Sequence, residues 1–440
     1  MRLHIDKAIY GGAGLGRVSD EGNALFGKTI FVPFSLPGET VDVHIIEDKR
    51  SYATGELDAV LVDSATRTTP ACPYFGSCGG CHYQHSVYAG QLEMKQAILR
   101  ETLERARLRN LPEISVVAAE PWAYRNRIRL LVESQPGFGL CYRRRKSHAT
   151  LPVTQCPIAA PLLERAIAVV TNVGLACGLC DLCQEIEFFT GAEEETLLIS
   201  MLCSRTPRNA ALMMASACSA LANEIPELKG AALFAHGDED NQGQILARWG
   251  EPALQYRAAG RDYRVSLGSF FQVNRFLVDR LAALVAEGRS GALAWDLYAG
   301  GGLFAGALSG SFERVVAVES AAFSSADLTH NLQAHNMQGA PHRAVRHTAR
   351  EFLRQQARGK AVPPDLVVVD PPRSGLGDEV ASLLAKAAPQ EIVYVSCDPA
   401  TLSRDLNTLI QSGYHLKQIH LVDLFPQTFH MESVVALSRT

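Results

Sequence analysis

Downstream of Gly260, four apolar runs of strand length alternate with helical patterns, and this alternation constrains the fold most strongly. The runs are ALAWDLYA, VVAVE, DLVVVD and EIVYVSC, and the patterns between and around them include FLVDRLAALVAEG and EVASLLAKA. Near-continuous apolar strands occur in parallel sheets that helices cover on both faces. The sequence therefore predicts a doubly wound, mostly parallel α/β domain over residues 256–440.

The remaining residues predict two further domains, since 440 residues suffice for about three domains of roughly 150 each. Residues 1–62 alternate apolar and polar side chains in short stretches broken by Gly, Asp and Pro, which favours a small OB-type β-barrel. Residues 63–255 predict a mixed α/β central domain. The helical pattern over 88–110 lies within it, and we expect that helix to pack on the third domain.

The charge distribution is uneven along the chain. The net charge is −4, but residues 1–160 carry 19 basic and 16 acidic side chains, a net +3, which leaves −7 for the other 280. One segment concentrates the positive charge: Arg125, Arg127, Arg129, Arg143, Arg144, Arg145 and Lys146. Such a segment is either an RNA-binding surface or a solvated face of two adjacent strands.

Hydropathy argues against a membrane partner. No run approaches the ~18 apolar residues of a membrane span, and the first residues alternate charge and apolarity too early for a signal peptide. We expect a cytoplasmic monomer. Eleven cysteines in a reducing compartment indicate metal binding or catalysis rather than disulfides.

Three cysteines lie close together in a Gly-rich stretch, C-x5-C-x2-C, and a fourth follows well downstream: Cys72, Cys78, Cys81 and Cys156. Soft thiolates select iron–sulfur clusters or zinc, and four of them suit either a [4Fe–4S] cluster or a structural zinc ion. A second run, Cys177, Cys180 and Cys183, also has ligand-like spacing. Its fourth partner could only be Cys203 or Cys218, so a second metal site is the weaker prediction.

Polar residues follow the strands of the predicted parallel sheet. Tyr298 and three glycines follow the first strand, and Glu319 at the end of the next is placed to bind ribose hydroxyls. This pattern alone fits NAD as well as S-adenosylmethionine. Asp370 and Cys397 end the next two strands, and hydride transfer has no need of that thiol.

A thiol and a carboxylate around one ring suit methylation at carbon 5 of uracil. Addition of a thiolate to C6 makes C5 nucleophilic enough to attack a sulfonium methyl group, and a base must then remove the C5 proton. Cys397 is the candidate nucleophile. Glu432, in a loop between the strands QIHLV and VVALS, is the candidate base.

Together these motifs resemble the RNA (uracil-5-)methyltransferase family, in particular its TRAM-containing 23S rRNA branch. The resemblance covers essentially the whole chain: FVPFSLPGE, CPYFGSCGGCHYQH, YRNRIRL, SFFQVN, DLYAGGG, VVAVE, DPPRSGL, SCDPATLSRDL and DLFPQTFHMESVVAL. It implies an enzyme that forms 5-methyluridine in structured RNA, 23S rRNA first and tRNA second. A non-catalytic iron–sulfur RNA-binding protein on the same fold is the alternative from another class.

The resemblance also implies the role of individual residues. S-adenosylmethionine would bind at Gln272, Tyr298, Glu319 and Asp370. Cys397 would be the nucleophile, Glu432 the base, and the cysteines at 72, 78, 81 and 156 the ligands of a [4Fe–4S] cluster. The N-terminal barrel would be a TRAM domain that binds RNA.

Overall fold

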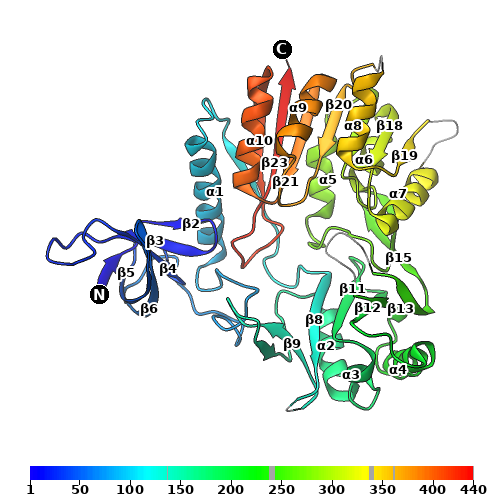
Figure 1. The fold of residues 1–440 in the computed structure, drawn as a ribbon, viewed down its shortest axis with the longest axis horizontal. Helices are drawn as coiled ribbons and strands as arrows, with labels where there is room; N and C mark the ends of the chain where they lie inside the picture. The colour runs from blue at the N-terminus through cyan, green and yellow to red at the C-terminus, as the bar shows by residue number, and fades with distance from the viewer. Residues whose placement is uncertain (136, 237–242, 336–340, 360–361, 440) are drawn as a thin grey trace.

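The protein consists of three parts, each built on its own large sheet. The computed structural model describes residues 1–135, 137–236, 243–335, 341–359 and 362–439. A six-stranded sheet lies at the left of Figure 1, a seven-stranded sheet at the lower right and an eight-stranded sheet at the upper right. Within these ranges, every helix is too short or too polar to cross a lipid bilayer.

The first 62 residues form the six-stranded sheet, in the order β1–β5–β6–β4–β3–β2. Buried and accessible residues alternate along its strands, and Val41 and Val43 are fully buried. A Cβ atom on Gly16 would lie 2.1 Å from the His4 carbonyl oxygen, so glycine lets the two ends of the sheet meet, as a small barrel requires. The strands are β1 (Arg2–His4), β2 (Lys7–Ile9), β3 (Ala13–Arg17), β4 (Thr29–Pro33), β5 (Thr40–Asp48) and β6 (Tyr52–Val62).

The eight-stranded sheet has the order β19–β18–β17–β20–β21–β23–β22–β7 and confirms the predicted doubly wound domain. All pairings are parallel except the two that β23 makes, which are antiparallel. The strands are β7 (Ile114–Val117), β17 (Gly291–Leu297), β18 (Phe312–Val318), β19 (Arg343–Val345), β20 (Leu366–Val369), β21 (Glu391–Ser396), β22 (Tyr414–Val422) and β23 (Glu432–Arg439).

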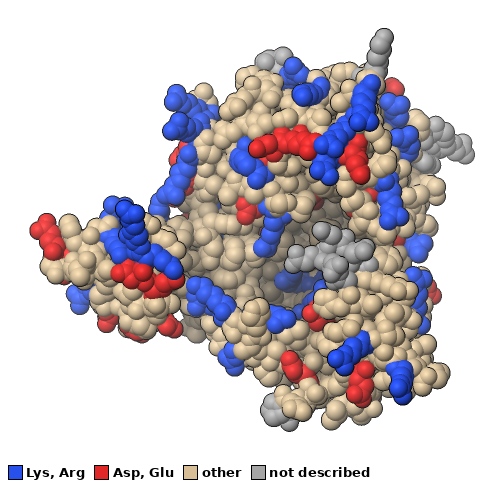
Figure 2. All heavy atoms as spheres, viewed as in Figure 1, with Lys and Arg blue, Asp and Glu red and all other residues tan. Residues whose placement is uncertain are grey.

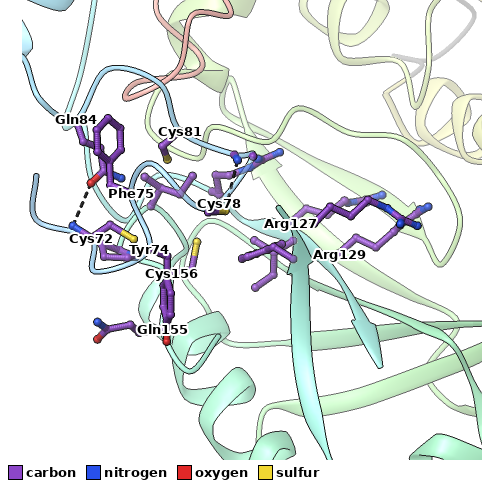
Figure 3. Close-up of a pocket in the computed structure, with 18 of the residues that line it drawn as sticks. Cys72, Tyr74, Phe75, Cys78, Cys81, Gln84, Arg127, Arg129, Gln155 and Cys156 are labelled. Carbon is purple, nitrogen blue, oxygen red and sulfur yellow. Dashed lines mark hydrogen bonds between the residues drawn. The ribbon is translucent and has the colours of Figure 1, made fainter. Parts of the chain in front are cut away.

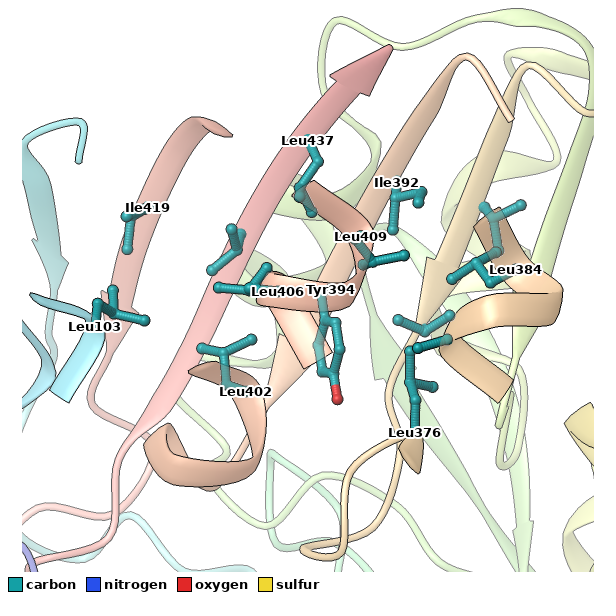
Figure 4. Packing of buried hydrophobic residues seen from close by; sticks show 14 of the residues in the cluster. Leu103, Leu376, Leu384, Ile392, Tyr394, Leu402, Leu406, Leu409, Ile419 and Leu437 are labelled. Atoms are coloured by element: carbon teal, nitrogen blue, oxygen red, sulfur yellow. The ribbon is translucent and has the colours of Figure 1, made fainter. Parts of the chain in front are cut away.

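Helices cover both faces of this sheet, which explains its continuous apolar runs. Val367 and Val369 of β20 pack into one core, whereas Leu366 and Val368 pack into the other. Figure 4 shows the first core, where Leu402, Leu406 and Leu409 contact the sheet from one helix. The helices are α5 (Val278–Ala286), α6 (Leu303–Leu308), α7 (Ala322–His335), α8 (Ala349–Arg358), α9 (Gly377–Ala387) and α10 (Pro399–Gln411).

Residues 88–117 pack on and extend the eight-stranded sheet, although more than 150 residues separate them in the sequence from its next strand. Helix α1 (Tyr88–Arg105) contributes Ile98, Leu99 and Leu103 to the first core and packs against α10. Strand β7 pairs in parallel with β22 at the sheet edge. The sequence predicted no strand here and assigned residues 114–117 to the central domain, because four residues carry no mark of the sheet that they join.

The central part is a seven-stranded sheet in the order β10–β9–β8–β11–β12–β13–β14, followed by the hairpin β15–β16. Helices α2 and α4 contribute Leu163, Ile167 and Leu221 to the core against it. The elements are β8 (Arg127–Glu133), β9 (Gly139–Arg143), β10 (Thr150–Pro152), α2 (Pro161–Val173), α3 (Leu179–Leu182), β11 (Glu185–Thr190), β12 (Leu197–Cys203), α4 (Ala210–Glu224), β13 (Leu228–Ala235), β14 (Ile245–Gly250), β15 (Ala253–Ala258) and β16 (Arg261–Ser266).

Candidate active site and cysteine pocket

The predicted site residues of the C-terminal domain gather at one edge of the eight-stranded sheet. Strands β17, β18, β20 and β21 are parallel, so their carboxyl ends meet there. Tyr298, Glu319, Asp370 and Cys397 each follow one of these ends. This is the edge at which open α/β sheets bind their ligands.

Glu432 reaches the same edge because β23 runs the other way. β23 lies between β21 and β22, and Ser433 pairs with Ser396 in the antiparallel register. Glu432 is therefore the first residue of β23 rather than part of a loop, and it lies beside the residue that follows Ser396, which is Cys397. The sequence alone did not predict this register.

Burial dominates the electrostatics of this pair. Burial raises the pKa of the Cys397 thiol to about 12, and Glu432 and Asp370 add to the shift, whereas Arg373 opposes it. Burial and Asp370 likewise hold the pKa of Glu432 well above its usual range. Oε1 of Glu432 is buried and accepts no hydrogen bond from the described residues. A buried carboxylate without a partner is costly, so this oxygen is available to a proton from a bound molecule.

The residues after Cys397 begin helix α10. The Asp398 side chain accepts hydrogen bonds from the backbone N–H groups of Ala400 and Thr401, each at 2.9 Å, and Pro399 occupies the first helical position. Two N–H groups of the helix terminus are thereby occupied. Because these N–H groups already donate to Asp398, they do not stabilise a thiolate at Cys397. The raised pKa of the Cys397 thiol agrees with this arrangement.

Arg373 lies on the exposed side of the same site. Its guanidinium donates to the His430 ring, with N···N distances of 3.2 and 3.4 Å. Burial and Arg373 lower the pKa of His430 to about 3, so the ring is neutral and accepts this hydrogen bond. Arg373 is the cation that lowers the pKa of both Cys397 and Glu432.

The predicted cofactor residues surround the glycine turn after β17. Oε2 of Glu319 accepts from the backbone N–H of Gly300 at 2.9 Å, and Oε1 accepts from Ala321 at 2.7 Å. Tyr298 and Gly302 both adopt positive φ, which bends the chain sharply into α6. Phe271, next to Gln272, packs within van der Waals distance of the Gly301 position. The structure thus brings Glu319 to the turn that follows Tyr298, and the residue before Gln272 packs near the same turn.

Asp296, the last polar residue of β17, was missed as a candidate although it stands in the DLYAGGG motif. It is fully buried, its Oδ2 accepts from the Ala305 N–H at 2.8 Å, and its Oδ1 has no hydrogen bond with the described residues. Burial first, then Asp370 and Glu319, raises its pKa well above the usual range. Four carboxyl groups of the described residues therefore share this edge: Asp296, Glu319, Asp370 and Glu432. Burial also raises the pKa of Asp370.

The four predicted metal-ligating cysteines line one pocket of about 440 Å³. Figure 3 shows Cys72, Cys78, Cys81 and Cys156 around it, with Arg127 and Arg129 projecting along its far side. Burial raises the pKa of Cys81 to about 12, and the other three thiols add to that shift. In the described part of the chain, no three His, Cys, Asp or Glu side chains are arranged to hold a metal ion. The four sulfurs therefore line the pocket without surrounding one common point.

Comparison with known proteins decides the family. The sequence model of the tRNA (uracil-5-)-methyltransferase family matches residues 87–440, and that of the TRAM domain matches residues 2–57. The chain belongs to the tRNA (uracil-5-)-methyltransferase family. It is thus an S-adenosylmethionine-dependent RNA methyltransferase, and the NAD alternative is excluded.

Relatives of this methyltransferase span nearly its whole length. An "Uncharacterized RNA methyltransferase" of Aquifex aeolicus (strain VF5) is 31% identical over 99% of this chain and 98% of its own. The 23S rRNA (uracil(1939)-C(5))-methyltransferase RlmD of Klebsiella pneumoniae (strain 342) is 31% identical, covering 94% and 91%. The crystal structure of the Pyrococcus abyssi tRNA (uracil-54, C5)-methyltransferase with S-adenosyl-L-homocysteine superposes with a TM-score of 0.76 at 24% identity, covering 99% and 100%, which shows a shared fold.

The basic segment of the methyltransferase is partly neutralised. Glu187 of β11 accepts from Arg129 at 3.0 Å and lies 3.5 Å from Arg127. The pairing of β8 with β11 brings these side chains together, and the local sequence around the arginines does not predict it. The remaining charges include exposed side chains, among them Arg143, Arg144 and Lys146. The face drawn in Figure 2 is hollowed between its upper and lower halves, and Lys and Arg side chains lie around the hollow.

The second cysteine run lies beside the core of the central part, and only its last member is buried in that core. Cys183 follows α3 and is buried in the same core as Cys203 and Cys218, whereas Cys177 and Cys180 are half-buried. Among the described residues these thiols, too, form no group arranged to hold a metal ion. Cys183, Cys203 and Cys218 act here as small apolar core residues.

The electrostatics of the site predict the reactivity of Cys397. Arg373→Gln should raise the pKa of the thiol and slow its alkylation by iodoacetamide at fixed pH, because only the thiolate reacts. We expect roughly a two- to tenfold decrease, since salt screens an exposed charge. Peptide mass spectrometry measures the rate at Cys397, and Arg350→Gln on α8 is the matched control. Equal alkylation rates in wild type and Arg373→Gln would contradict this electrostatic role.

Proposed function

We propose that this protein transfers a methyl group from S-adenosylmethionine to C5 of a uridine in 23S rRNA through a covalent adduct between Cys397 and C6. The observation that carries the proposal is the register of β23, which places Glu432 beside Cys397 at the sheet edge. A nucleophile and a base within reach of one bound ring are what this reaction needs. Membership of the uracil-5 methyltransferase family supports the same chemistry.

The residues act in sequence. The Cys397 thiol gives its proton to solvent, the thiolate bonds to C6, and the electron pair of the 5,6 double bond moves toward C5. C5 then takes the methyl group of S-adenosylmethionine, whose S–CH3 bond breaks so that S-adenosylhomocysteine leaves. Glu432 accepts the C5 proton, the C5–H electrons re-form the double bond, and the C6–S bond breaks to release Cys397. The raised pKa of Glu432 makes it a stronger base than an ordinary carboxylate.

Gln272, Tyr298, Glu319 and Asp370 are the proposed contacts of S-adenosylmethionine. Glu319 already accepts the Gly300 N–H and keeps further lone pairs for ribose hydroxyls. Asp370 follows β20, between the glycine turn after β17 and Cys397 after β21. This position lets its carboxyl group contact either the cofactor or the uracil.

Cys72, Cys78, Cys81 and Cys156 are the proposed ligands of a [4Fe–4S] cluster, with a zinc ion as the alternative. The donor set fits, since four free thiols line one pocket and soft thiolates select these centres. The Cys78 Sγ also accepts from the Gly80 N–H at 3.4 Å, as cluster-ligating sulfurs do. Methyl transfer by polar displacement needs no electron, so the proposed role of the cluster is structural.

The RNA would cover the basic, cysteine-bearing half while one uridine enters the catalytic edge. Flipping a uridine out of a folded RNA costs a few kcal/mol, which phosphate contacts elsewhere can offset.

The relative named RlmD favours 23S rRNA, whereas the family description keeps tRNA as the second candidate. The juxtaposition of Cys397 and Glu432 argues against a non-catalytic RNA-binding protein. We further propose that the enzyme is cytoplasmic and monomeric.

Substrate class is tested by methyl transfer to separated RNAs. Purified protein with radiolabelled S-adenosylmethionine should label unmodified 23S rRNA and not tRNA from the same cells. Mass spectrometry should find the label as 5-methyluridine. Labelling of tRNA alone would establish the second candidate instead.

The covalent route is tested with RNA that contains 5-fluorouridine, whose fluorine cannot be removed as a proton. Wild type should accumulate a protein–RNA adduct, and Cys397→Ala should form none. Glu432→Gln should accumulate a methylated adduct on ordinary RNA, because proton removal stalls after methyl transfer. Near wild-type turnover by either variant would remove that residue from the mechanism.

The cysteine pocket is tested on protein purified without oxygen. It should be brown, contain about four irons per chain and absorb broadly near ~400 nm. The variant Cys81→Ser should lose the iron, whereas Cys180→Ser in the second run should retain it. Colourless protein with one zinc per chain would establish the zinc alternative.

The RNA-binding surface is tested by neutralising its exposed charges. Arg143→Gln/Arg144→Gln/Lys146→Gln should weaken RNA binding and flatten its salt dependence by ~0.7–0.9 log units for each phosphate that is no longer neutralised. Arg145 is left in place because its guanidinium lies 4.7 Å from the centre of the Phe34 ring of the N-terminal barrel, and its substitution would also remove this contact. A triple variant on α8, at Arg350, Arg354 and Arg358, is the charge-matched control. Equal salt slopes in both variants would mean that the basic segment is only a solvated face.

A further inference from the structure

The segment that leads into Glu432 is held by hydrogen bonds along its backbone. Each carbonyl oxygen from Leu424 to Gln427 accepts from a group elsewhere in the chain. The donors are Asn274 Nδ2 to Leu424 at 3.1 Å, Lys95 Nζ to Phe425 at 3.0 Å, Tyr124 Oη to Pro426 at 3.1 Å, and the backbone N–H groups of His82 and Tyr83 to Gln427 at 2.8 and 3.0 Å.

Helix α1 contributes two side chains, Gln91 and Lys95, which lie one turn apart on the same face. Gln91 accepts from the backbone N–H of Gln427 at 2.9 Å and donates to its Oε1 at 2.9 Å. Lys95 donates to Asp423 Oδ1 at 2.6 Å, and both side chains of this ion pair are fully buried. Gln91 and Gln427 are 1% and 2% exposed.

Such a buried polar set contributes little to stability. Desolvation of a buried ion pair offsets most of its attraction, and an apolar pair of similar volume is often equally stable. These groups instead fix the position of the 423–427 backbone, because hydrogen bonds restrict position more narrowly than apolar contacts do. Glu432 lies only five residues beyond Gln427 and makes no hydrogen bond through its own Oε1 in the described structure. The position of its carboxyl group therefore depends on the backbone on both sides: the register of β23 fixes the residues that follow, and the 423–427 segment fixes those that precede it.

We propose that Gln91 and Lys95 are positioning residues that fix the 423–427 segment and thereby hold Glu432 at Cys397. The proposal rests on the proposed role of Glu432 as the base. Neither residue contacts the reacting atoms. Loss of either positioning interaction slows removal of the C5 proton and leaves the earlier addition of Cys397 unaffected.

The test compares Gln91→Met with Gln96→Met on the same helix. Gln96 also donates a side-chain hydrogen bond, to the Ile114 carbonyl at 2.7 Å, but away from the 423–427 segment. Gln91→Met should lower turnover of ordinary RNA about ten- to a hundredfold and accumulate methylated adduct. Its rate of adduct formation with 5-fluorouridine RNA should stay within about twofold of wild type. Gln96→Met should match wild type in both assays.

A second variant covers the case in which Gln91→Met does not fold. Lys95→Met/Asp423→Leu replaces the ion pair by apolar side chains of similar volume and should show the same stalled, methylated adduct with an unchanged thermal unfolding midpoint. If both variants turn over normally while Glu432→Gln stalls, the positioning role is wrong. If either folded variant also loses adduct formation with 5-fluorouridine RNA, the inference is overturned as well. Normal turnover by Glu432→Gln would instead overturn the proposed base.

Discussion

The proximity of Glu432 to Cys397 depends on one strand that runs antiparallel to its neighbours. If β23 were parallel to β21, the segment before it would lie at the opposite edge of the sheet, and Glu432 could not reach Cys397. Because it is antiparallel and inserted between β21 and β22, its first residue meets the end of β21. A sheet that presents only the ends of parallel strands to its ligand thereby gains a carboxyl group from the beginning of another strand.

Several buried carboxyl groups lie at this edge of the sheet, although the core of a protein normally excludes such groups. Asp296 and Glu432 each keep a buried oxygen without a hydrogen bond in the described structure, and burial raises the pKa of both. Such groups are tolerated where the surrounding fold is stable enough to bear their cost. The two apolar cores on the faces of the sheet supply that stability, and the carboxyl groups remain available to a ligand.

The three parts of the protein converge on the same few residues. Tyr10 of the N-terminal barrel donates to the Cys397 carbonyl at 3.4 Å and packs edge-on against Phe429. His82, next to the cysteine pocket, contacts Phe429 with ring centres 4.6 Å apart. Residues of the barrel and of the stretch beside the cysteine pocket are therefore in contact with the segments around Cys397. This proximity gives the outer parts a physical route to influence the site.

Much of the fold follows from local sequence. Apolar runs such as DLVVVD determine a covered parallel sheet, because each strand must bury both faces. Residues that directly follow those runs, such as Glu319, Asp370 and Cys397, are consequently placed at the ligand-binding edge. The cysteine spacing likewise marked four residues that line one pocket.

Only the tertiary structure decided which distant residues meet. The antiparallel register that places Glu432 beside Cys397, the pairing of Glu187 with Arg127 and Arg129, and the addition of β7 to the catalytic sheet all join segments far apart in the chain. Local sequence specifies which side chains a strand or helix presents to its surroundings. The partner of each is chosen by strand order and packing, which depend on the free energy of the whole fold.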